Sequence, residues 1–346
     1  MSTFTFLLIS DVTFILMALS SLFGTRFTRN LKTAVFATMV AVLALLTLAR
    51  PLGIGADDYY YVQMAQDAGD LSLPDLLGIY ERDPVYFYLL HHITQFAGVR
   101  ALMVIASIVF LLKAFFISKL VQDRLFALYA YFCLSFFLQE VIQFRASLAT
   151  MFMFSAIYFF QRSSNLVTLA SGVAAGLSHY SGYAVFLLLK TMKARPLLYM
   201  APLAMAVVSL LGIPGLASSV VSRYLPEILF ITRYLEDENR LFQAGFNSAT
   251  IALYLAIAIS GKRIVVSRSS STGLLAVNLS ALVVLLFKDI VTFAVRLNEL
   301  FLTFYTLNVG NFRDDRTDLR RVLLVAALGL FYMRWRWIGL ISYQPI

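Results

Sequence analysis

Long apolar runs, each followed by a few polar or basic residues, dominate the pattern of the chain. The first two, about Phe4 to Phe23 and Thr33 to Ala49, have the length and hydrophobicity of membrane-spanning helices. A closed β-barrel would instead show apolar and polar residues in alternation. The pattern therefore predicts an all-α polytopic integral membrane protein with about 10 to 12 transmembrane helices. We expect it to form a single transmembrane domain over residues 1–346.

Further spanning helices are predicted along the rest of the chain. Runs with two clear ends lie at about 101–120, 166–177, 196–213 and 274–287, and other runs end near Glu140, Arg162, Lys190, Lys262, Arg313 and Trp335. The segment DPVYFYLLHHITQFAG is too short and too polar for a span, so it is expected to form an interfacial helix along the bilayer surface.

Basic residues predict the orientation of these helices, because Lys and Arg gather in cytoplasmic loops. Arg26, Arg29 and Lys32 follow the first helix, which places that loop inside and the N-terminus outside. Later inward loops also carry Lys or Arg with few acids, and nearly all carboxylates fall on the outward side. Two large periplasmic loops are therefore expected, at about 50–100 and 214–247.

Composition narrows the class of protein further. Hydrophobic residues make up 60% of the chain, charged residues 14%, and the mean hydropathy is +0.80, which excludes an ordinary soluble domain. The net charge of +9 lies in small groups at helix ends, so it indicates membrane orientation and no nucleic-acid partner. Cys133 is the only cysteine, which excludes an internal disulfide and a cysteine-based metal site. The opening residues lack a basic segment and a cleavage site, so the first run is expected to be a retained anchor.

The stretch from Gly55 to Tyr86 holds the densest group of chemically active side chains. It reads GADDYYYVQMAQDAGDLSLPDLLGIYERDPVY, with carboxylates interleaved among tyrosines. Carboxylates accept protons and hydrogen bonds from hydroxyl groups, while aromatic faces cover the apolar C–H side of sugar rings. The stretch is therefore typical of a carbohydrate site, although composition alone favours a solvated loop between two membrane helices.

Three ionisable residues near the ends of apolar helices are further candidates, because such residues are costly in a membrane. Arg145 lies at the outer mouth of the fifth predicted helix, Arg296 at the outer mouth of the eleventh, and His179 at the outer turn between the sixth and seventh. Either arginine alone is also compatible with snorkelling to lipid phosphates, and the histidine with an ordinary interfacial hydrogen bond. Asp11, within the first helix, could pair with a neighbouring basic residue.

Five short elements, in order, resemble those of the EpsG family of Wzy-like polysaccharide polymerases. They are GADDYYYVQMAQ, ERDPVYFYLLHHI, FRASLATMFMFSAIYF, AAGLSHYSGYAVF and AVRLNELFLTF, and they cover about Gly55 to Leu307. The family's elements are an Asp-x-x-x-Tyr stretch, Glu-Pro-Gly-Tyr, Ile-Arg-Gln, Phe-His-x-Ser and a late arginine. In this chain they are matched, in that order, by Asp58 with Tyr61 or Tyr60, by Asp83-Pro84-Val85-Tyr86, by Arg145, by Ser178-His179-Tyr180-Ser181 and by Arg296.

The chain departs from the family's pattern at three of these positions. Asp83 stands where the family has Glu, Val85 replaces Gly, and Ala146 replaces Gln after the arginine. The shorter carboxylate reaches about one methylene less far. Loss of the glycine suggests a different backbone at that turn, since glycine would allow a positive φ.

The resemblance implies an inverting glycosyltransferase of the bacterial inner membrane. It would join oligosaccharide repeat units, carried on undecaprenyl diphosphate, into O-antigen or exopolysaccharide at the periplasmic face. Arg145 and Arg296 are then expected to bind the diphosphate leaving group, because guanidinium groups bind phosphate oxygens in a bidentate manner. Asp58 is the first choice and His179 the second for the base that deprotonates the acceptor hydroxyl. Further substrate contacts are expected from Asp57, Tyr61, Asp83, Tyr86, Glu140, Arg223 and Arg233.

No cofactor and no bound metal are expected, since no metal-ligand spacing is visible and arginines can neutralise the diphosphate. Expected partners are the lipid-linked oligosaccharide, membrane lipid, and chain-length regulator and flippase proteins. Two rival functions remain open. A ligase would use the same donor. A strain that lacks the gene distinguishes the two functions: loss of a ligase leaves undecorated core, whereas loss of a polymerase leaves single-repeat lipopolysaccharide. A transporter would show repeated halves and discontinuous helices, and neither is evident in the sequence.

Overall fold

The computed structural model describes residues 1–55, 57–191, 272–273, 275–276, 279–280, 300–311 and 319–337. Regular structure within these ranges is helical, with no β-strand among them, which confirms the all-α prediction. Four described segments are long and apolar enough to cross a membrane, namely Thr3–Arg26, Arg29–Ala49, Pro84–Leu120 and Arg124–Ile142. The helices predicted between residues 196 and 299 lie almost wholly outside the described residues, so the predicted total stays a prediction.

The helices of the described residues have the following bounds. They are α1 (Thr3–Phe23), α2 (Arg29–Ala49), α3 (Asp58–Asp70), α4 (Leu73–Tyr80), α5 (Pro84–Ala97), α6 (Ala101–Leu120), α7 (Arg124–Tyr131), the π-helix η3 (Phe132–Ile142), α8 (Phe144–Gln161), α9 (Asn165–Ser178), α10 (Ala184–Thr191), α17 (Tyr305–Val309) and α18 (Leu319–Trp337). Short 3-10 turns lie at η1 (Gly24–Arg26), η2 (Gly98–Arg100) and η4 (Tyr180–Tyr183).

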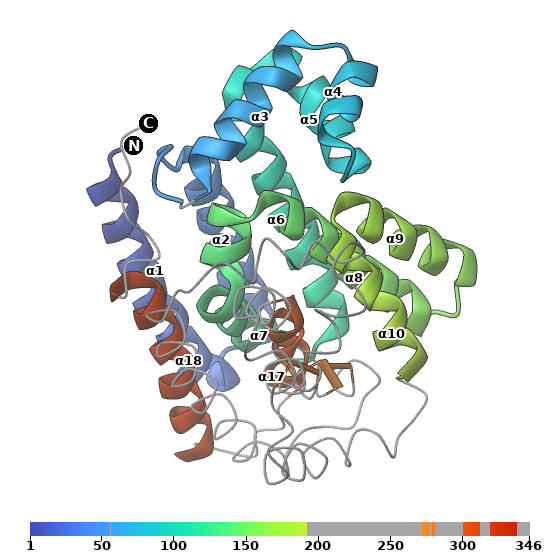
Figure 1. Ribbon diagram of the computed structural model, residues 1–346. Coiled ribbons are helices and arrows are strands. Elements are labelled where there is room, and N and C mark those ends of the chain that lie inside the picture. The colour runs from blue at the N-terminus through green and yellow to red at the C-terminus, as the bar shows by residue number, and fades with distance from the viewer. Residues whose placement is uncertain are drawn as a thin grey trace, which may run out of the picture.

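The central layer of the fold is formed by α6, α7, η3 and α8, with α1 and α2 on one side and α9 on the other (Figure 1). Every residue of η3 is buried, and so are all residues from 125 to 142. By contrast, α1 exposes a row of large apolar side chains, among them Phe4, Leu8 and Ile15. Such a surface suits lipid contact, because an exposed apolar face of this length is costly in water.

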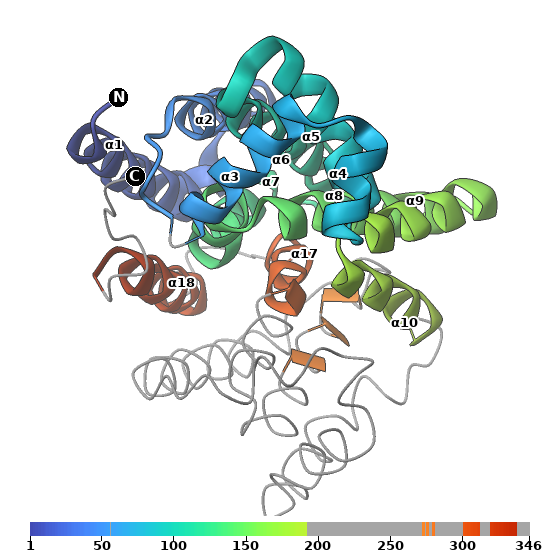
Figure 2. The same cartoon turned by 45° about the horizontal axis from the view of Figure 1, so that its top comes forward.

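The first and last described helices lie side by side, as Figures 1 and 2 both show for α1 and α18. The rings of Phe14 and Tyr332 stack with centroids 4.3 Å apart. The hydroxyl of Tyr332 donates to Asp11 at 2.5 Å, and Arg336 lies 3.4 Å from the same carboxylate. Asp11 therefore has the basic neighbour expected from the sequence.

A second polar contact joins α1, α7 and α18 at the opposite end of α1. Arg321 donates to the carbonyl of Ser21 at 2.6 Å and forms an ion pair with Asp123 at 2.7 Å. The guanidinium also lies over the ring of Phe126, 4.6 Å from its centroid. Because Arg321 is buried, its charge needs this partner, and the contact fixes where α18 starts against the bundle.

The stretch predicted as a periplasmic loop at about 50–100 is mostly helical, and its place relative to the membrane stays a prediction. It forms α3, α4 and α5, which lie together at one end of the bundle, at the top in Figure 1. Ser72 accepts a hydrogen bond from the N–H of Asp75 and so caps α4, and Pro84 starts α5, where its missing N–H is harmless. The segment DPVYFYLLHHITQFAG does form a helix, α5, which leads through η2 directly into α6.

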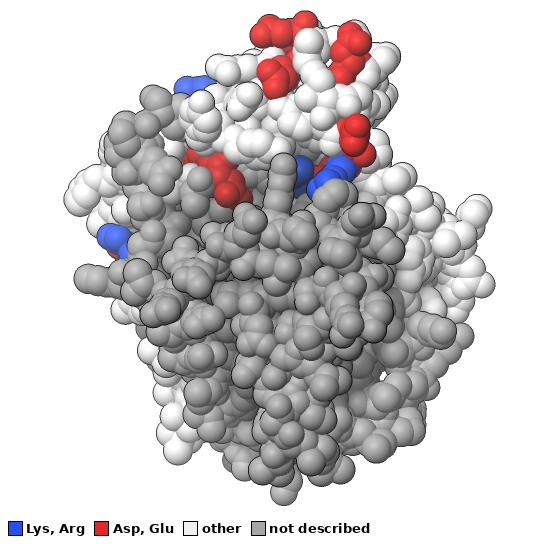
Figure 3. Space-filling model, viewed as in Figure 1, with Lys and Arg blue, Asp and Glu red and all other residues white. Residues whose placement is uncertain are grey.

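Charged side chains in this view gather on that helical end. Figure 3 shows acidic atoms over the upper part of the molecule, where α3, α4 and α5 lie, and basic atoms directly below them. The end of the bundle that carries the Asp/Tyr stretch is thus the end where acidic and basic side chains of the described residues lie close together in this view. A candidate site is therefore sought between α3–α5 and the start of α8.

Candidate functional site

An ion pair between Asp83 and Arg145 lies at the centre of this region. One guanidinium nitrogen, Nη1, donates to Oδ2 of Asp83 at 2.8 Å. The side chain of Asp83 is 4% exposed and that of Arg145 is 21% exposed, so the pair is open on the arginine side. Asp83 precedes α5 and Arg145 lies in the first turn of α8, so two segments far apart in the sequence meet here.

The backbone before α5 holds Asp83 in an unusual conformation. Glu81 has φ 45° and Asp83 has φ 56°, both in the left-handed region. Such a conformation costs a non-glycine residue about 1 to 2 kcal/mol, and aspartate tolerates it better than most residues. Pro84 disfavours the right-handed helical conformation at Asp83, and the contact with Arg145 supplies a compensating interaction. Val85 lies inside the regular helix α5, so the left-handed backbone falls at Glu81 and Asp83 and not at the family's glycine position.

Tyrosine rings line the ion pair. The guanidinium of Arg145 lies 5.9 Å from the ring centroid of Tyr60 and 5.9 Å from that of Tyr61. Tyr61 also packs edge-on against Tyr86, with centroids 6.3 Å apart, and against Phe144 at 4.9 Å. The site thus presents charge beside aromatic faces, the combination that the sequence suggested for sugar binding.

Two polar atoms at this site are buried without a hydrogen-bond partner among the described residues. They are Nε of Arg145 and the hydroxyl of Tyr86. An unsatisfied buried donor costs about 1 to 3 kcal/mol, so such groups persist where a ligand completes them. Oδ1 of Asp83 likewise receives no hydrogen bond from a described residue. Arg145 and Tyr86 thus keep two unsatisfied donors, both buried in this arrangement, and Asp83 keeps an acceptor oxygen without a described partner.

Burial also changes the acidity of the side chains around the pair. It raises the pKa of Asp83, although the nearby Arg145 guanidinium works in the opposite direction. It also raises the pKa of Tyr61, whose hydroxyl therefore stays protonated at neutral pH. A carboxylate with a raised pKa is a stronger base than an ordinary aspartate.

A second contact holds α4 over the pair. The hydroxyl of Tyr80, the last residue of α4, donates to Oδ2 of Asp67 on α3 at 2.6 Å. The ring of Tyr80 stacks on Phe87 of α5 with centroids 4.5 Å apart. Tyr80 thus joins all three helices of the stretch, directly beside the turn that carries Asp83.

Asp58, the residue preferred from the sequence as the base, has another role in the structure. Its two oxygens accept from Nη1 and Nη2 of Arg50, at 2.8 and 2.7 Å, and Oδ2 also accepts from the N–H groups of Gly53 and Gly55. Both side chains are almost completely buried, at 0% and 1% exposure. With its oxygens occupied and out of reach of solvent, Asp58 is not placed to take a proton from a substrate. It holds the start of α3 in place.

The glycine before Asp58 is part of the same arrangement. A side chain on Gly55 would lie 2.9 Å from the Asp58 carboxylate and 2.9 Å from the carbonyl of Val141. Only glycine therefore lets this loop lie between α3 and the end of η3. The contact brings the Asp/Tyr stretch against the segment that leads into Arg145.

Glu140, predicted as a substrate contact at an outer helix end, is also placed differently. It is fully buried in η3 and pairs with Lys113 of α6 at 2.8 Å. A substrate therefore cannot reach it directly in this arrangement. Asp57 stands at the N-cap of α3 without capping it through its side chain. Tyr61 and Tyr86, by contrast, do line the Asp83–Arg145 pair.

His179 lies in the turn between α9 and η4 and is half-buried. Its Nδ1 accepts from the N–H of Ser181 at 3.3 Å and lies 2.7 Å from the Ser181 hydroxyl. The ring stacks on Tyr180 with centroids 4.6 Å apart. An imidazole that accepts at Nδ1 in its neutral form carries its proton on Nε2.

Three predicted site residues, Arg223, Arg233 and Arg296, lie outside the described residues. The role of two charged residues in the described part of the chain was not identified from the sequence. Arg50 was taken only as the start of a loop, and Lys113 lies inside an apolar run, a position that is itself a signal for a special role. No group of three or more His, Cys, Asp or Glu suited to a metal ion occurs among the residues that the structure describes.

Comparison with known proteins gives one match. A sequence model of the EpsG family matches residues 33–344, which is most of the chain. Comparisons with curated proteins and with solved structures gave no match.

Proposed function

The chain belongs to the EpsG family, and on that premise we propose that it is a glycosyltransferase that lengthens a polysaccharide. Membership of this family suggests a role like that of a polysaccharide polymerase. Its donor is a glycan carried on a lipid diphosphate such as undecaprenyl diphosphate, and its acceptor is a repeat unit on the same lipid. The single observation that carries this proposal is the Asp83–Arg145 pair, with an unpartnered guanidinium nitrogen and hydroxyl beside tyrosine rings.

Arg145 binds the diphosphate of the leaving group in this proposal. A guanidinium group donates two parallel hydrogen bonds to phosphate oxygens, and it stabilises the negative charge that develops as the diphosphate leaves. The exposed part of the Arg145 side chain is available for this contact, and its buried Nε, which has no partner within the described residues, would gain one if the diphosphate reached it. Arg296, from outside the described residues, is proposed as a second group that binds the diphosphate.

Asp83 acts as the base. The acceptor hydroxyl oxygen attacks the anomeric carbon of the donor sugar, and its proton passes to Oδ1 of Asp83. The bond from the anomeric carbon to the diphosphate oxygen breaks, and the diphosphate leaves with the electron pair. Attack opposite to the leaving group inverts the anomeric configuration. Burial raises the pKa of Asp83, which favours this proton transfer, while Arg145 keeps the carboxylate oriented at 2.8 Å.

Tyrosine side chains hold the sugars beside the reacting groups. Tyr60 and Tyr61 offer ring faces next to Arg145, and the Tyr86 hydroxyl donates to a sugar or phosphate oxygen. The half-buried His179 is proposed to donate a hydrogen bond from Nε2 and not to act as the base. A glycan suits these contacts because it has hydroxyl groups for the hydrogen bonds and apolar C–H faces for the tyrosine rings.

Placement in the inner membrane, with the site toward the periplasm, completes the proposal. A cysteine placed at Ser72, before α4, should react with a thiol reagent that does not cross the membrane, while a cysteine at Ser269 should not. The native Cys133 is buried and gives little background. Labelling of position 269 in intact cells would put the site on the wrong face.

The direct test replaces Arg145 with Lys in a strain that lacks the native gene. Lysine keeps the charge but cannot reproduce the bidentate fork, so the glycan ladder should collapse to single repeat units while the protein accumulates normally. The matched control is Arg162→Lys at the other end of α8, where the guanidinium lies over Tyr158 at 4.4 Å, and its ladder should be normal.

Each outcome of this test is informative. A normal ladder from Arg145→Lys would reduce this residue to an anchor and remove the proposed site. Lipopolysaccharide core without any attached repeat unit in the deletion strain would point to a ligase. Accumulation of repeat units on the cytoplasmic side would point to a transporter.

A further inference from the structure

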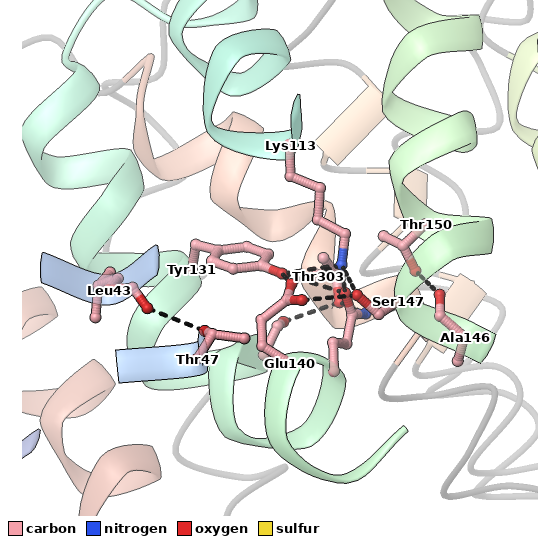
Figure 4. Close-up of polar contacts among 11 residues, drawn as sticks. Leu43, Thr47, Lys113, Tyr131, Glu140, Ala146, Ser147, Thr150 and Thr303 are labelled. Carbon is pink, nitrogen blue, oxygen red and sulfur yellow. Dashed lines mark hydrogen bonds and ion pairs between the residues drawn. The ribbon is translucent and has the colours of Figure 1, made fainter. Parts of the chain in front are cut away.

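A fully buried lysine lies within the membrane-crossing segment that ends at Leu120. Lys113 of α6 is 0% exposed and lies within hydrogen-bond distance of Gln139, Glu140 and Ser147, each at 2.8 Å, and of Tyr131 at 3.1 Å. Figure 4 shows its ammonium group directed into the space between η3 and α8. Charges at such depth are expensive, so they mark a specific task.

The surrounding polar groups complete one another. Glu140 accepts from Tyr131 and, through its other oxygen, from Ser147 at 2.8 Å. The amide of Gln139 donates to Thr303 at 2.8 Å, and Thr303 also contacts Ser135 at 2.8 Å. We call these residues the Lys113 network. It consists of Lys113, Tyr131, Ser135, Gln139, Glu140, Ser147 and Thr303.

The Lys113 network leaves no donor or acceptor for a substrate. None of its buried side-chain atoms is without a hydrogen-bond partner. A lysine has three N–H donors, so the four acceptors around Lys113 already exceed what it can supply at once. The contrast with Arg145 and Tyr86, which keep unpartnered atoms, excludes direct binding as the task of the network.

What the network holds is the junction between η3 and α8. A π-helix is wider than an α-helix and is often found at functional sites. Here it ends at Ile142, and α8 starts at Phe144 without a side-chain cap, because Gln143 makes no such hydrogen bond. Ser147 supplies the missing attachment, since its hydroxyl joins this first turn of α8 to Glu140 and Lys113.

Arg145 lies in that same first turn, two residues before Ser147. Its guanidinium must hold a hydrogen bond to Asp83 at 2.8 Å and leave Nε toward the ligand. A shift of about 1 Å in such a group costs up to a hundredfold in rate. A helix start that lacks a cap and is fixed by buried charges is therefore placed to set this distance.

We propose that the Lys113 network positions Arg145 for catalysis, with Ser147 as the residue that transmits its position to the arginine. The proposal rests on the function proposed for Arg145. Lys113, Glu140 and Ser147 are positioning residues, since none of them touches the substrate. Their effect is on the rate of transfer and not on substrate binding.

The test compares two serines on α8. Ser147→Ala breaks the link to the network, while Ser155→Ala removes a similar buried hydrogen bond, to Ser171 of α9 at 3.0 Å, eight residues further along. Lipid extract from the deletion strain, which accumulates lipid-linked repeat units, supplies the substrate at several concentrations. We expect Ser147→Ala to lower kcat about tenfold with KM changed less than about twofold, and Ser155→Ala to leave both near wild type.

A thermal-shift measurement on the purified proteins distinguishes a loss of stability from a displacement of Arg145. Ser147→Ala should lower the melting temperature more than Ser155→Ala does, because the Ser147 hydroxyl donates to Glu140 and accepts from Lys113, whereas the Ser155 hydroxyl makes one contact, to Ser171. Rates are therefore compared per folded molecule. Equal kcat values from the two at equal folded protein would overturn the proposal. Ser147→Thr keeps the hydroxyl and is expected to recover most of the rate. Failure of Ser147→Thr to exceed Ser147→Ala would also count against it.

Paired substitution gives a second route if a single variant accumulates poorly. Lys113→Met with Glu140→Gln removes both charges together, which avoids leaving one of them buried alone. This double variant should accumulate but show a lowered kcat, and adding Arg145→Lys to it should cost less than Arg145→Lys costs in the wild type. Strictly additive losses would contradict positioning. A fully active Arg145→Lys single variant would instead contradict the proposed function itself.

Discussion

Two aspartates of the same stretch of sequence, Asp58 and Asp83, form arginine pairs with different properties. Asp58 and Arg50 form a closed pair, with 1% and 0% exposure and both carboxylate oxygens in use. Asp83 and Arg145 form an open pair, joined by one hydrogen bond, with 21% exposure on the arginine side. Phe144 links the two, because Arg50 lies over its ring and Tyr61 packs against its edge.

The difference teaches what to look for in a buried ion pair. A carboxylate whose two oxygens are both hydrogen-bonded, as in Asp58, stabilises the arrangement of the chain and offers no acceptor to a ligand. A pair that keeps a buried polar atom without a hydrogen-bond partner still bears the desolvation cost of that atom. A ligand that supplies the missing hydrogen bond therefore binds more favourably. Both oxygens of Asp58 are in use and Oδ1 of Asp83 is not, whereas each arginine, Arg50 and Arg145, keeps a buried Nε without a partner among the described residues. The two aspartates therefore differ at their carboxylates, although both stand beside tyrosines in the sequence.

The largest expected effect comes from Asp83→Asn. Asparagine keeps an oxygen for Arg145 but cannot take a proton, so the rate of chain elongation should fall about a hundredfold to ten-thousandfold at a normal amount of protein. Asp83→Glu restores the residue that resembles the family's pattern and should retain activity. The matched control is Asp75→Asn on exposed α4, which should elongate normally. A full-length ladder from Asp83→Asn would remove the base from this position.

The pH dependence sharpens the same comparison. The deprotonated form of Asp83 is the active one, so the rate should fall about tenfold per pH unit below its pKa. Burial raises that pKa, so the fall should begin at a higher pH than for an ordinary aspartate. Because the folded state then binds this proton more tightly than the unfolded chain, the Asp83 group favours folding as the pH drops. Activity should thus be lost on the acid side without unfolding from this group, and Asp83→Asn should lose that acid limb.

The next effect in size is on stability and belongs to the closed pair. Asp58→Asn leaves the Arg50 guanidinium buried without a charged partner, which costs about 3 to 5 kcal/mol. The amount of protein in the membrane should drop, and the activity per folded molecule should stay close to wild type. Arg50→Gln combined with Asp58→Asn removes both charges and should recover much of the amount. Normal accumulation of Asp58→Asn with poor elongation would return the base role to Asp58.

Much of the helical framework could be predicted from the sequence, because apolar runs of spanning length have few other solutions. The predicted segments at 101–120 and 166–177 agree with α6 and α9 to within one residue at each end. The stretch at 50–100 was predicted as a periplasmic loop with one interfacial helix, and the structure adds the short helices α3 and α4 before that helix, α5. In the structure Asp58 and Asp83 are buried and paired with arginines, while α3 packs on α5 and α6.

The site could be predicted only in part. Arg145, Asp83, Tyr61 and Tyr86 were all named from the sequence, and the structure brings them together. Which aspartate is satisfied depends on Arg50 and on two backbone N–H groups, and no local pattern shows that three-dimensional arrangement. Glu140 was misplaced because its partner Lys113 lies 27 residues earlier in the chain, on another helix.

A smaller effect is expected from the Tyr86 hydroxyl. Tyr86→Phe removes a buried donor that has no partner, so stability should be unchanged or slightly higher, while the rate should fall about tenfold if the hydroxyl binds the substrate. Tyr129→Phe is the matched control, because the Tyr129 hydroxyl donates to the carbonyl of Val325 at 2.8 Å. That variant should lose about 1 kcal/mol of stability and keep its rate per folded molecule. The reverse pattern would show that Tyr86 serves only packing.

The smallest expected effect concerns Tyr80, which joins α4 to the open pair without touching it. Tyr80→Phe keeps the ring stacked on Phe87 and removes only the hydrogen bond to Asp67, so stability should fall by about 1 kcal/mol. The turn that holds Asp83 then gains freedom, and because Asp83 must stay in its left-handed conformation, the rate should fall a few-fold, roughly twofold to fivefold. Tyr88→Phe, on the exposed face of α5, is the control and should change neither quantity. Initial rates and melting temperatures of both variants decide the matter. A Tyr80→Phe protein that is less stable yet fully active would show that the open pair keeps its geometry without help from α4.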